Sequence, residues 1–142
     1  GAEFITISTD SVIGLNSAFP VNGNGHRFIA YLFASLDGVS KVGSYTGMPS
    51  ATAYSVTLGF TPKFVMIKAA DRAGDWNVFD VERGLTVGGT SAVAVALNTT
   101  DNESQTGLTD NIRATSNGFV ITTSANSDVN EDGKKYLYYA IA

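Results

Sequence analysis

Short apolar runs alternate with turn-forming residues along the chain, and this pattern predicts strands and not helices. Apolar residues never keep the i, i+3, i+4, i+7 spacing of an amphipathic helix for more than about one turn. The runs come at intervals of roughly ten residues. We therefore expect an all-β fold, an antiparallel, jelly-roll-like β-sandwich of about eight to ten short strands. The runs predicted as strands are Phe28–Ala34, Lys41–Tyr45, Tyr54–Leu58, Lys63–Ala69, Trp76–Val81, Ala92–Asn98, Ile112–Thr115, Phe119–Thr123 and Tyr136–Ala142.

Residues with special backbone preferences mark the turns between these runs. Asn117-Gly118 is a dipeptide that favours a two-residue hairpin turn of type I′. Pro62 has a fixed φ and no backbone donor, so we expect it at the entrance of the next strand. Phe28–Ala34 is apolar throughout and has aromatic and β-branched residues, which predicts a buried strand.

The chain contains an internal repeat. Residues 21–34 read VNGNGHRFIAYLFA, and residues 129–142 read VNEDGKKYLYYAIA. The two segments align with each other without a gap. Five positions are identical and five more are conservative replacements. Upstream, residues 4–7 resemble residues 119–122. The second copy therefore ends the chain with the same elements that end the first copy.

The repeat predicts that the chain contains parts of two tandem β units. Such units stack and bury surface against one another. We expect residues 39–142 to form one complete β-sandwich unit. Residues 4–38 are then the closing hairpin of a preceding β unit, and residues 1–3 are interpreted as a cloning scar.

Charge and composition exclude several classes of partner. The formal net charge is −4, whereas nucleic acid and anionic membranes attract clustered Lys and Arg. The longest apolar run, Phe28–Ala34, is too short to span a bilayer. Charged residues make up only 15% of the chain, which is low for a free-standing domain. Such a surface is expected where sister chains cover much of it, which indicates self-association.

Catalytic residues of the common kinds are scarce. Cysteine is absent, which removes disulfides, zinc-thiolate sites and Cys nucleophiles. The single histidine, His26, is replaced by Lys134 in the repeat, so its position is that of a solvated strand end and not of a general base. We expect no enzyme activity and no cofactor.

The acidic and aromatic segment around Trp76 is the best candidate for ligand binding. It reads DRAGDWNVFDVERG over residues 71–84, and Asp75, Trp76 and Arg83 would suit a sugar subsite. The favoured interpretation is structural: a turn followed by an amphipathic strand, with Asp80 and Arg83 paired near its end. Trp76 then contributes core or subunit-interface area.

A weak calcium candidate lies just before the last strand. Asp128, Asn130 and Asp132, followed by a glycine, fit the first half of a calcium-binding loop, D-x-N-x-D-G. The position of the closing bidentate Glu holds Tyr139, and the first copy of the repeat has no carboxylate there. An Asn/Asp-Gly turn explains both copies, so no metal is expected.

Several phrases in this order resemble a β-rich domain found near the C-termini of large structural proteins of tailed phages, such as tail-fibre and appendage proteins. The likeness covers the chain from about residue 25 onward and implies no catalytic residues. One departure is residues 48–54, which are less Gly-rich than in the family. The phrases are FIAYLFA (28–34), KVGSYTG (41–47), LGFTPKFVMIK (58–68), GDWNVFDVERG (74–84), ALNTTDNES (96–104), SNGFVI (116–121) and YLYYAIA (136–142).

The resemblance gives a context for function. We expect a virion structural protein, a distal tail-fibre or appendage domain on the extracellular phage particle. It would form a homotrimer, contact other virion proteins and contribute to host attachment, by weak binding of a host surface glycan. Multivalent display would strengthen such binding. The alternatives are a capsid decoration (cement) protein and, less favoured, a glycan-degrading tailspike enzyme.

Overall fold

The computed structural model describes residues 5–9, 12–15, 22–49, 53–89, 92–100, 112–122 and 127–142. The chain divides into two compact units, Gly1–Leu32 and Phe33–Ala142. Whether residues 4–38 close a preceding β unit stays a prediction. No helix in the described part of the chain has the length and apolarity of a membrane span.

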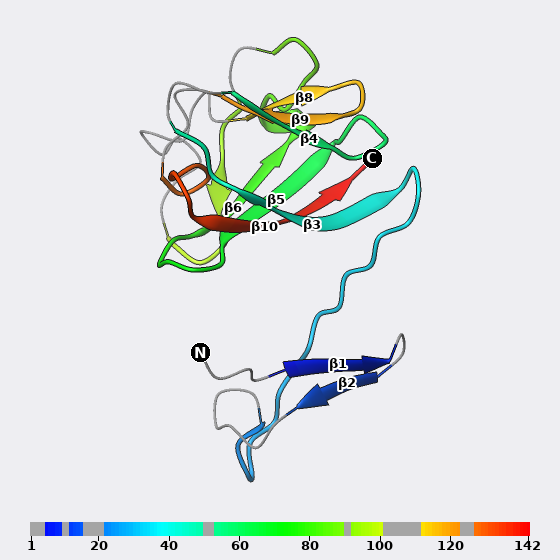
Figure 1. Ribbon diagram of the computed structural model, residues 1–142, viewed down its shortest axis with the longest axis vertical. Helices are drawn as coiled ribbons and strands as arrows, with labels where there is room; N and C mark the ends of the chain where they lie inside the picture. Colours follow the sequence, from blue (N-terminus) through cyan, green and yellow to red (C-terminus); the bar gives the residue numbers. More distant parts are fainter. Residues whose placement is uncertain are drawn as a thin grey trace. The chain divides into compact units, whose positions relative to one another are not determined.

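The first unit contains an antiparallel hairpin of β1 (Ile5–Thr9) and β2 (Val12–Leu15) (Figure 1). Its register shifts between Ile7 and Thr9. Each strand of the hairpin is the only ladder partner that the described residues give the other.

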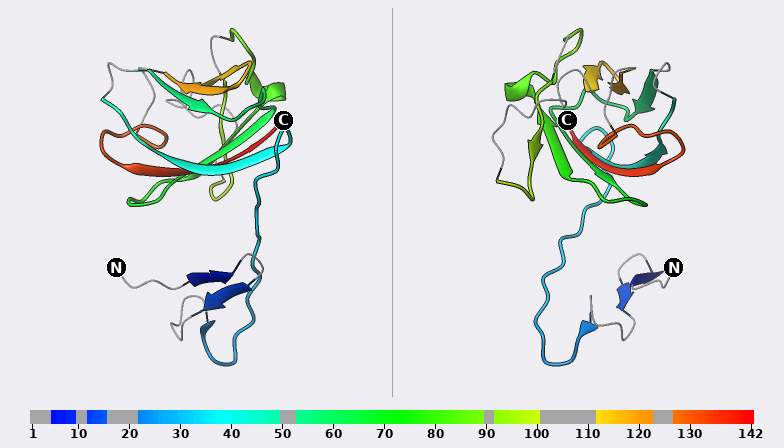
Figure 2. Two further views of the ribbon diagram at one scale, coloured as in Figure 1. Left: turned by 45° about the vertical axis from the view of Figure 1, so that its right-hand side comes forward. Right: turned by 90° about the vertical axis from the view of Figure 1, so that its left-hand side faces the viewer.

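The second unit is a sandwich of two antiparallel sheets, as the sequence predicts (Figures 1 and 2). The larger sheet has the order β3-β10-β5-β6-β7, and the smaller has the order β4-β9-β8. The 3-10 helix η1 (Val81–Arg83) follows β6. The strands are β3 (Ser40–Thr46), β4 (Tyr54–Thr57), β5 (Phe64–Ala69), β6 (Trp76–Asp80), β7 (Val95–Ala96), β8 (Ile112–Thr115), β9 (Gly118–Ile121) and β10 (Lys135–Ile141).

The core lies between the two sheets, and side-chain alternation explains which residues enter it. In β5 and β10 every second residue is buried, because successive side chains point to opposite faces of a sheet. Tyr136, Phe79 and Ile67 of the larger sheet are fully buried, as are Phe119 and Ile112 of the smaller. The last strand, β10, lies between β3 and β5, so the larger sheet is complete only when the end of the chain is in place.

The hairpin of β8 and β9 is confirmed, but its turn lies one residue earlier than predicted. Thr115 pairs with Gly118, so Ser116 and Asn117 form the two-residue loop. Gly118 serves a different purpose. A Cβ at this position would overlap the backbone carbonyl of Val56 in the neighbouring β4, so only glycine allows this close approach of strands.

One strand prediction is wrong, and another is confirmed only in part. Phe28–Ala34, predicted as a buried strand, has no strand assignment and its side chains are exposed. Its counterpart β10 lies between two partner strands, whereas the described residues give Phe28–Ala34 none. Ala92–Asn98 is extended only in part: β7 covers two residues and pairs only with Asn77 and Val78 of β6.

Candidate functional site

The larger sheet has an apolar outer face, on the side turned away from the smaller sheet. One register row crosses all five strands of the sheet. Directly paired residues point to the same side, so the row forms a continuous stripe of apolar side chains. Its members, in strand order, are Val42, Tyr139, Met66, Val78 and Val95.

The neighbouring rows contain both apolar and polar residues. Leu137 and Trp76 lie in one of them together with Ser44 and Lys68, and Phe64 and Ile141 lie in the other together with Ser40 and Asp80. The side chains of Leu137, Trp76 and Val42 remain 46%, 43% and 42% exposed. Exposed apolar residues that gather on one sheet face mark an interaction site more often than single exposed residues do. We define the outer face by Val42, Phe64, Met66, Trp76, Val78, Val95, Leu137, Tyr139 and Ile141.

The predicted ligand residues Asp75 and Trp76 lie together at one edge of this face. Asn98 joins them: its side-chain amide donates to the Asp75 carboxylate (2.9 Å) and its carbonyl oxygen accepts the Trp76 backbone N–H (2.9 Å). The backbone oxygen of Trp76 also accepts the N–H of Leu97 (2.9 Å). The arrangement holds a half-exposed indole beside a carboxylate and an amide, which are groups that suit sugar hydroxyls and sugar ring faces.

Arg83 is not part of this group. It lies in η1 after the far end of β6, and four residue steps of strand separate Trp76 from Asp80, about 13 Å. The Arg83 guanidinium forms an ion pair with the Asp80 carboxylate, and the Arg83 backbone N–H donates to the same carboxylate (2.9 Å). The predicted pairing of Asp80 with Arg83 is thereby confirmed.

The calcium candidates take separate partners. Asp128 lies 3.4 Å from the Arg72 guanidinium, and the Asn130 side-chain oxygen accepts the Met48 backbone N–H (2.8 Å). Asp132 is exposed. Within the described ranges, no group of three or more His, Cys, Asp or Glu residues is placed to hold a metal ion.

Arg72 joins the β5–β6 turn to the loop that precedes β10. Its Nε lies 2.9 Å from a Glu131 carboxylate oxygen, and its Nη1 donates to the Ser127 carbonyl (3.0 Å). The same guanidinium reaches Asp128, so a protein cation occupies the position beside these carboxylates. This cluster explains the acidic loop as a structural element.

Two buried tyrosines, Tyr45 and Tyr136, support the same region, and a third, Tyr138, packs against Phe119 of the smaller sheet. The Tyr45 hydroxyl donates to the Val129 carbonyl (2.6 Å), and the Tyr136 hydroxyl accepts the Glu131 backbone N–H (2.8 Å). Burial raises the pKa of Tyr45, and the neighbouring Tyr136 raises it further. Burial also raises the pKa of Tyr136 and of Tyr138. These hydroxyls are held neutral and serve the fold.

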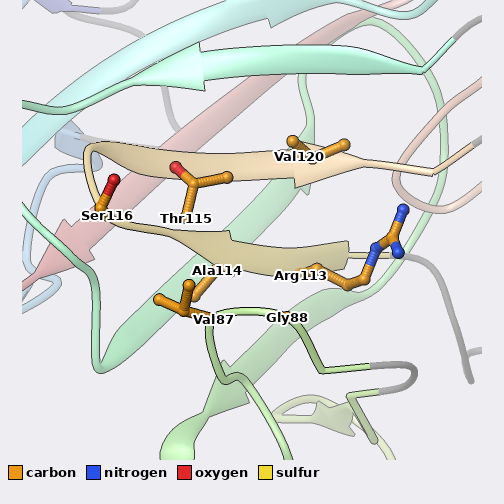
Figure 3. A pocket seen from close by; sticks show the side chains of 7 residues that line it. All are labelled: Val87, Gly88, Arg113, Ala114, Thr115, Ser116 and Val120. Carbon is orange, nitrogen blue, oxygen red and sulfur yellow. The ribbon is translucent and has the colours of Figure 1, made fainter.

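A shallow hollow of about 310 Å³ lies on the outer side of the smaller sheet (Figure 3). The loop after η1 forms one wall, with Val87 next to Ala114 of β8. Arg113 and Ser116 lie at opposite ends of the hollow in this view. Among the described residues that line the hollow, Arg113 is the one charged group, and the others are aliphatic, glycine or hydroxyl-bearing. The hollow offers no convergent set of catalytic groups.

Sequence reasoning missed Asn98, Arg72 and the outer face. Asn98 and Arg72 act across chain separations of 22 and 55 residues or more, which no local pattern reveals. The outer face did have a signal. The runs FVMIKA and YLYYAI are largely apolar at both alternating sets of positions, which indicates strands covered on both faces.

The comparisons with known proteins give one match. A family model described as a domain of unknown function, DUF7483, matches residues 3–142. No curated protein and no solved structure matches the chain.

Proposed function

The chain belongs to the DUF7483 family, and we propose that it is a non-enzymatic structural module of a tailed-phage virion. In this proposal it is a distal tail-fibre or appendage domain that forms a homotrimer and contributes to host attachment. The likeness of its sequence phrases to phage appendage proteins supplies the context. The apolar outer face of the larger sheet is the observation that carries the proposal.

The outer face supports self-association because an exposed apolar sheet surface gains free energy when another surface covers it. Leu137 lies on this face in β10, the strand between β3 and β5, and this residue is 46% exposed. The low share of charged residues agrees with a chain that has covered surfaces. A trimer that covers this face around Leu137 and Tyr139, and leaves Trp76 at the edge of the face open to water, would present three copies of any weak ligand site.

The ligand site of the proposal is the group of Asp75, Trp76 and Asn98. A half-exposed indole beside fixed hydrogen-bonding groups suits a saccharide, and three weak sites on one trimer would act together. Arg83 is left out of this site because its guanidinium pairs with Asp80.

The oligomeric state tests the assembly. Light scattering coupled to size exclusion should give a trimer for the wild-type chain, and Leu137→Asp should give a monomer with an unchanged circular dichroism spectrum. Thr57→Asp is the matched control, since Thr57 is exposed on the smaller sheet, and it should remain trimeric. A wild-type chain that is monomeric at high concentration would contradict the proposal.

Glycan recognition and the absence of catalysis are tested separately. On an array of bacterial surface glycans, the wild-type chain should bind and Trp76→Ala should not, while Trp76→Phe retains part of the signal because a ring remains. The same glycans, incubated with the chain, should show no new reducing ends. New reducing ends would establish a glycan-degrading enzyme instead.

A further inference from the structure

The two copies of the repeat share a turn of the same geometry. Gly25 and Gly133 occupy corresponding positions and have φ values of +77° and +73°. In the first copy the N–H of His26 donates to the carbonyl of Gly23 (3.2 Å), and in the second the N–H of Lys134 donates to the carbonyl of Glu131 (3.1 Å). The repeat in the sequence is therefore also a repeat in backbone structure up to the end of this turn.

After the turn the two copies differ in their surroundings. Residues 135–141 form β10, which has β3 on one side and β5 on the other. Phe28–Ala34 has no ladder partner in the described part of the chain. The side chains of Ile29, Tyr31 and Leu32 are 81%, 79% and 71% exposed. Large apolar side chains at such exposure are unfavourable in water, so this segment requires a cover.

The first copy has the side-chain pattern that β10 needs. In β10 the residues at 136, 138 and 140 enter the core, and those at 137, 139 and 141 lie on the outer face. The alignment places Phe28, Ala30 and Leu32 at the core positions, and Ile29, Tyr31 and Phe33 at the outer ones. Both sets are apolar, as expected of an interior strand covered on both faces and not of an edge strand.

We propose that Phe28–Ala34 is a closing strand for a second sandwich of this same kind, a preceding unit of the same polypeptide. It inserts between strands equivalent to β3 and β5 of that unit, in the position that β10 has here. The β1–β2 hairpin does not supply these strands, because β1 and β2 pair with each other. The family match begins at residue 3, so the first copy lies within the family domain.

The joint after this strand is already ordered for such an arrangement. The Ser40 hydroxyl donates to the Ala34 carbonyl (2.9 Å), and the Val42 N–H donates to the Ser35 hydroxyl (3.0 Å). The Leu36 N–H donates to the Ser40 carbonyl (2.9 Å). These hydrogen bonds all lie within the second unit. In the sequence, Phe28–Ala34 is therefore followed by a short, hydrogen-bonded turn that leads into β3.

A tandem protein tests the insertion. In this protein, residues 1–26 are removed and a second copy of residues 33–134 is placed before Arg27. The added sandwich therefore lacks its own β10, and Phe28–Ala34 follows it in the position where β10 would come. The second unit is compact and has its own core, which makes it a suitable scaffold. We expect two folded sandwiches by nuclear magnetic resonance, and slow amide hydrogen exchange over residues 28–34, where the original chain exchanges fast.

Two control proteins make each outcome decisive. In the first control, residues 135–142 take the place of Phe28–Ala34 after the added copy, and this protein must give two folded sandwiches. In the second control, a Gly/Ser segment of equal length takes that place, and the added copy must remain unfolded. If the first control folds while the added sandwich stays unfolded with Phe28–Ala34, the proposal is wrong. Phe28–Ala34 could also insert into the added sandwich of another molecule. An oligomer in which the amides of residues 28–34 are protected from exchange would therefore support closing-strand insertion as well. The readout is amide protection, so failure here leaves the trimer and glycan tests of the proposed function unaffected.

Discussion

The ring of Phe33 lies against the ring of Tyr139, with centroids 4.5 Å apart and planes inclined by 36°. Phe33 precedes β3, and Tyr139 lies on the outer face in the middle of β10, so this pair ties the entry of the second unit to its closing strand. Tyr139 also meets Phe64 edge to face, with centroids 6.3 Å apart. The three rings form a small aromatic group that covers one part of the outer face.

Replacing Phe33 with alanine should lower the free energy of unfolding of the second unit by about 1 kcal/mol, a typical value for an aromatic pair. The Phe33 side chain is 51% exposed, so the loss should not reach that of a buried core residue. Urea unfolding followed by circular dichroism measures it. Ile29→Ala is the control and should leave the midpoint unchanged, since Ile29 is 81% exposed. Equal effects of the two substitutions would contradict a specific role for Phe33.

Trp76 gives a direct optical test of how far the trimer covers the outer face. It is the only tryptophan of the chain and is 43% exposed in the isolated chain. Glycan binding by the trimer requires that the indole stays in contact with water after assembly. The emission maximum and the quenching by iodide should therefore be the same for the assembled trimer and for the Leu137→Asp monomer. A shift to shorter wavelength on assembly would mean that the trimer covers Trp76, which would rule out this residue as a glycan-binding group of the trimer.

Because of Arg72, the acidic loop before β10 should not bind calcium. Arg72 lies 2.9 Å from Glu131 and 3.4 Å from Asp128, so its charge already compensates the two carboxylates. Titration of chelator-treated protein with calcium should therefore give no heat at a stoichiometry near one. Arg72→Met should lower stability by less than about 1 kcal/mol, since the Arg72 and Glu131 side chains are 24% and 41% exposed. Stoichiometric heat from the wild-type chain would revive the calcium interpretation.

The all-β fold was predictable because strand signals are local. Ile112–Thr115 was predicted with the bounds that β8 has, and the alternation within β5 and β10 follows from their own residues. Position in the sheet is not local. Phe28–Ala34 and Tyr136–Ala142 are similar in sequence, yet only the second has β3 and β5 as neighbours. A segment becomes a strand only when neighbouring strands supply its ladder hydrogen bonds and packing. The residues of the segment do not reveal whether those neighbours are present.

The candidate site shows the same limit. Asp75 and Trp76 are neighbours in sequence, so their proximity was certain, but Asn98 comes from beyond β7. Arg83 is close to Trp76 in sequence and yet distant in space, because an extended strand carries it away. A cluster in the sequence therefore predicts a cluster in space only where the chain turns back on itself.

Alkaline pH should destabilise the sandwich. Burial raises the pKa of Tyr45, Tyr136 and Tyr138 above the ordinary value of 10.0 in the folded chain. The unfolded chain ionises near pH 10, so the stabilising effect is complete below that pH and is lost as the pH rises toward the folded-state values. Each tyrosine contributes a slope of at most about 1.4 kcal/mol per pH unit. Urea midpoints between pH 8 and 11 test this, and Tyr45→Phe should reduce the slope.

Gly47 should tolerate alanine poorly. It follows β3, where its N–H donates to the Lys134 carbonyl (2.8 Å) and its carbonyl accepts the Gly133 N–H (3.1 Å). A Cβ at this position would overlap the backbone carbonyl of Glu131, and a backbone group held by hydrogen bonds has little freedom to move away. Gly47→Ala should therefore cost about 1–3 kcal/mol, the range for overpacking a closely packed site.

Thermal unfolding measures the effect of Gly47→Ala, with Thr46→Ala as the matched control, because the neighbouring Thr46 is exposed. The glycine variant should also exchange the amide hydrogens of residues 133 and 134 faster, since the displaced strand end breaks the bonds that hold this turn. Faster exchange at these amides together with lower stability would locate the damage at the contact between β3 and the turn before β10. A Gly47→Ala chain as stable as Thr46→Ala would mean that the turn shifts without cost, and that Gly47 does not fix the position from which β10 enters the sheet.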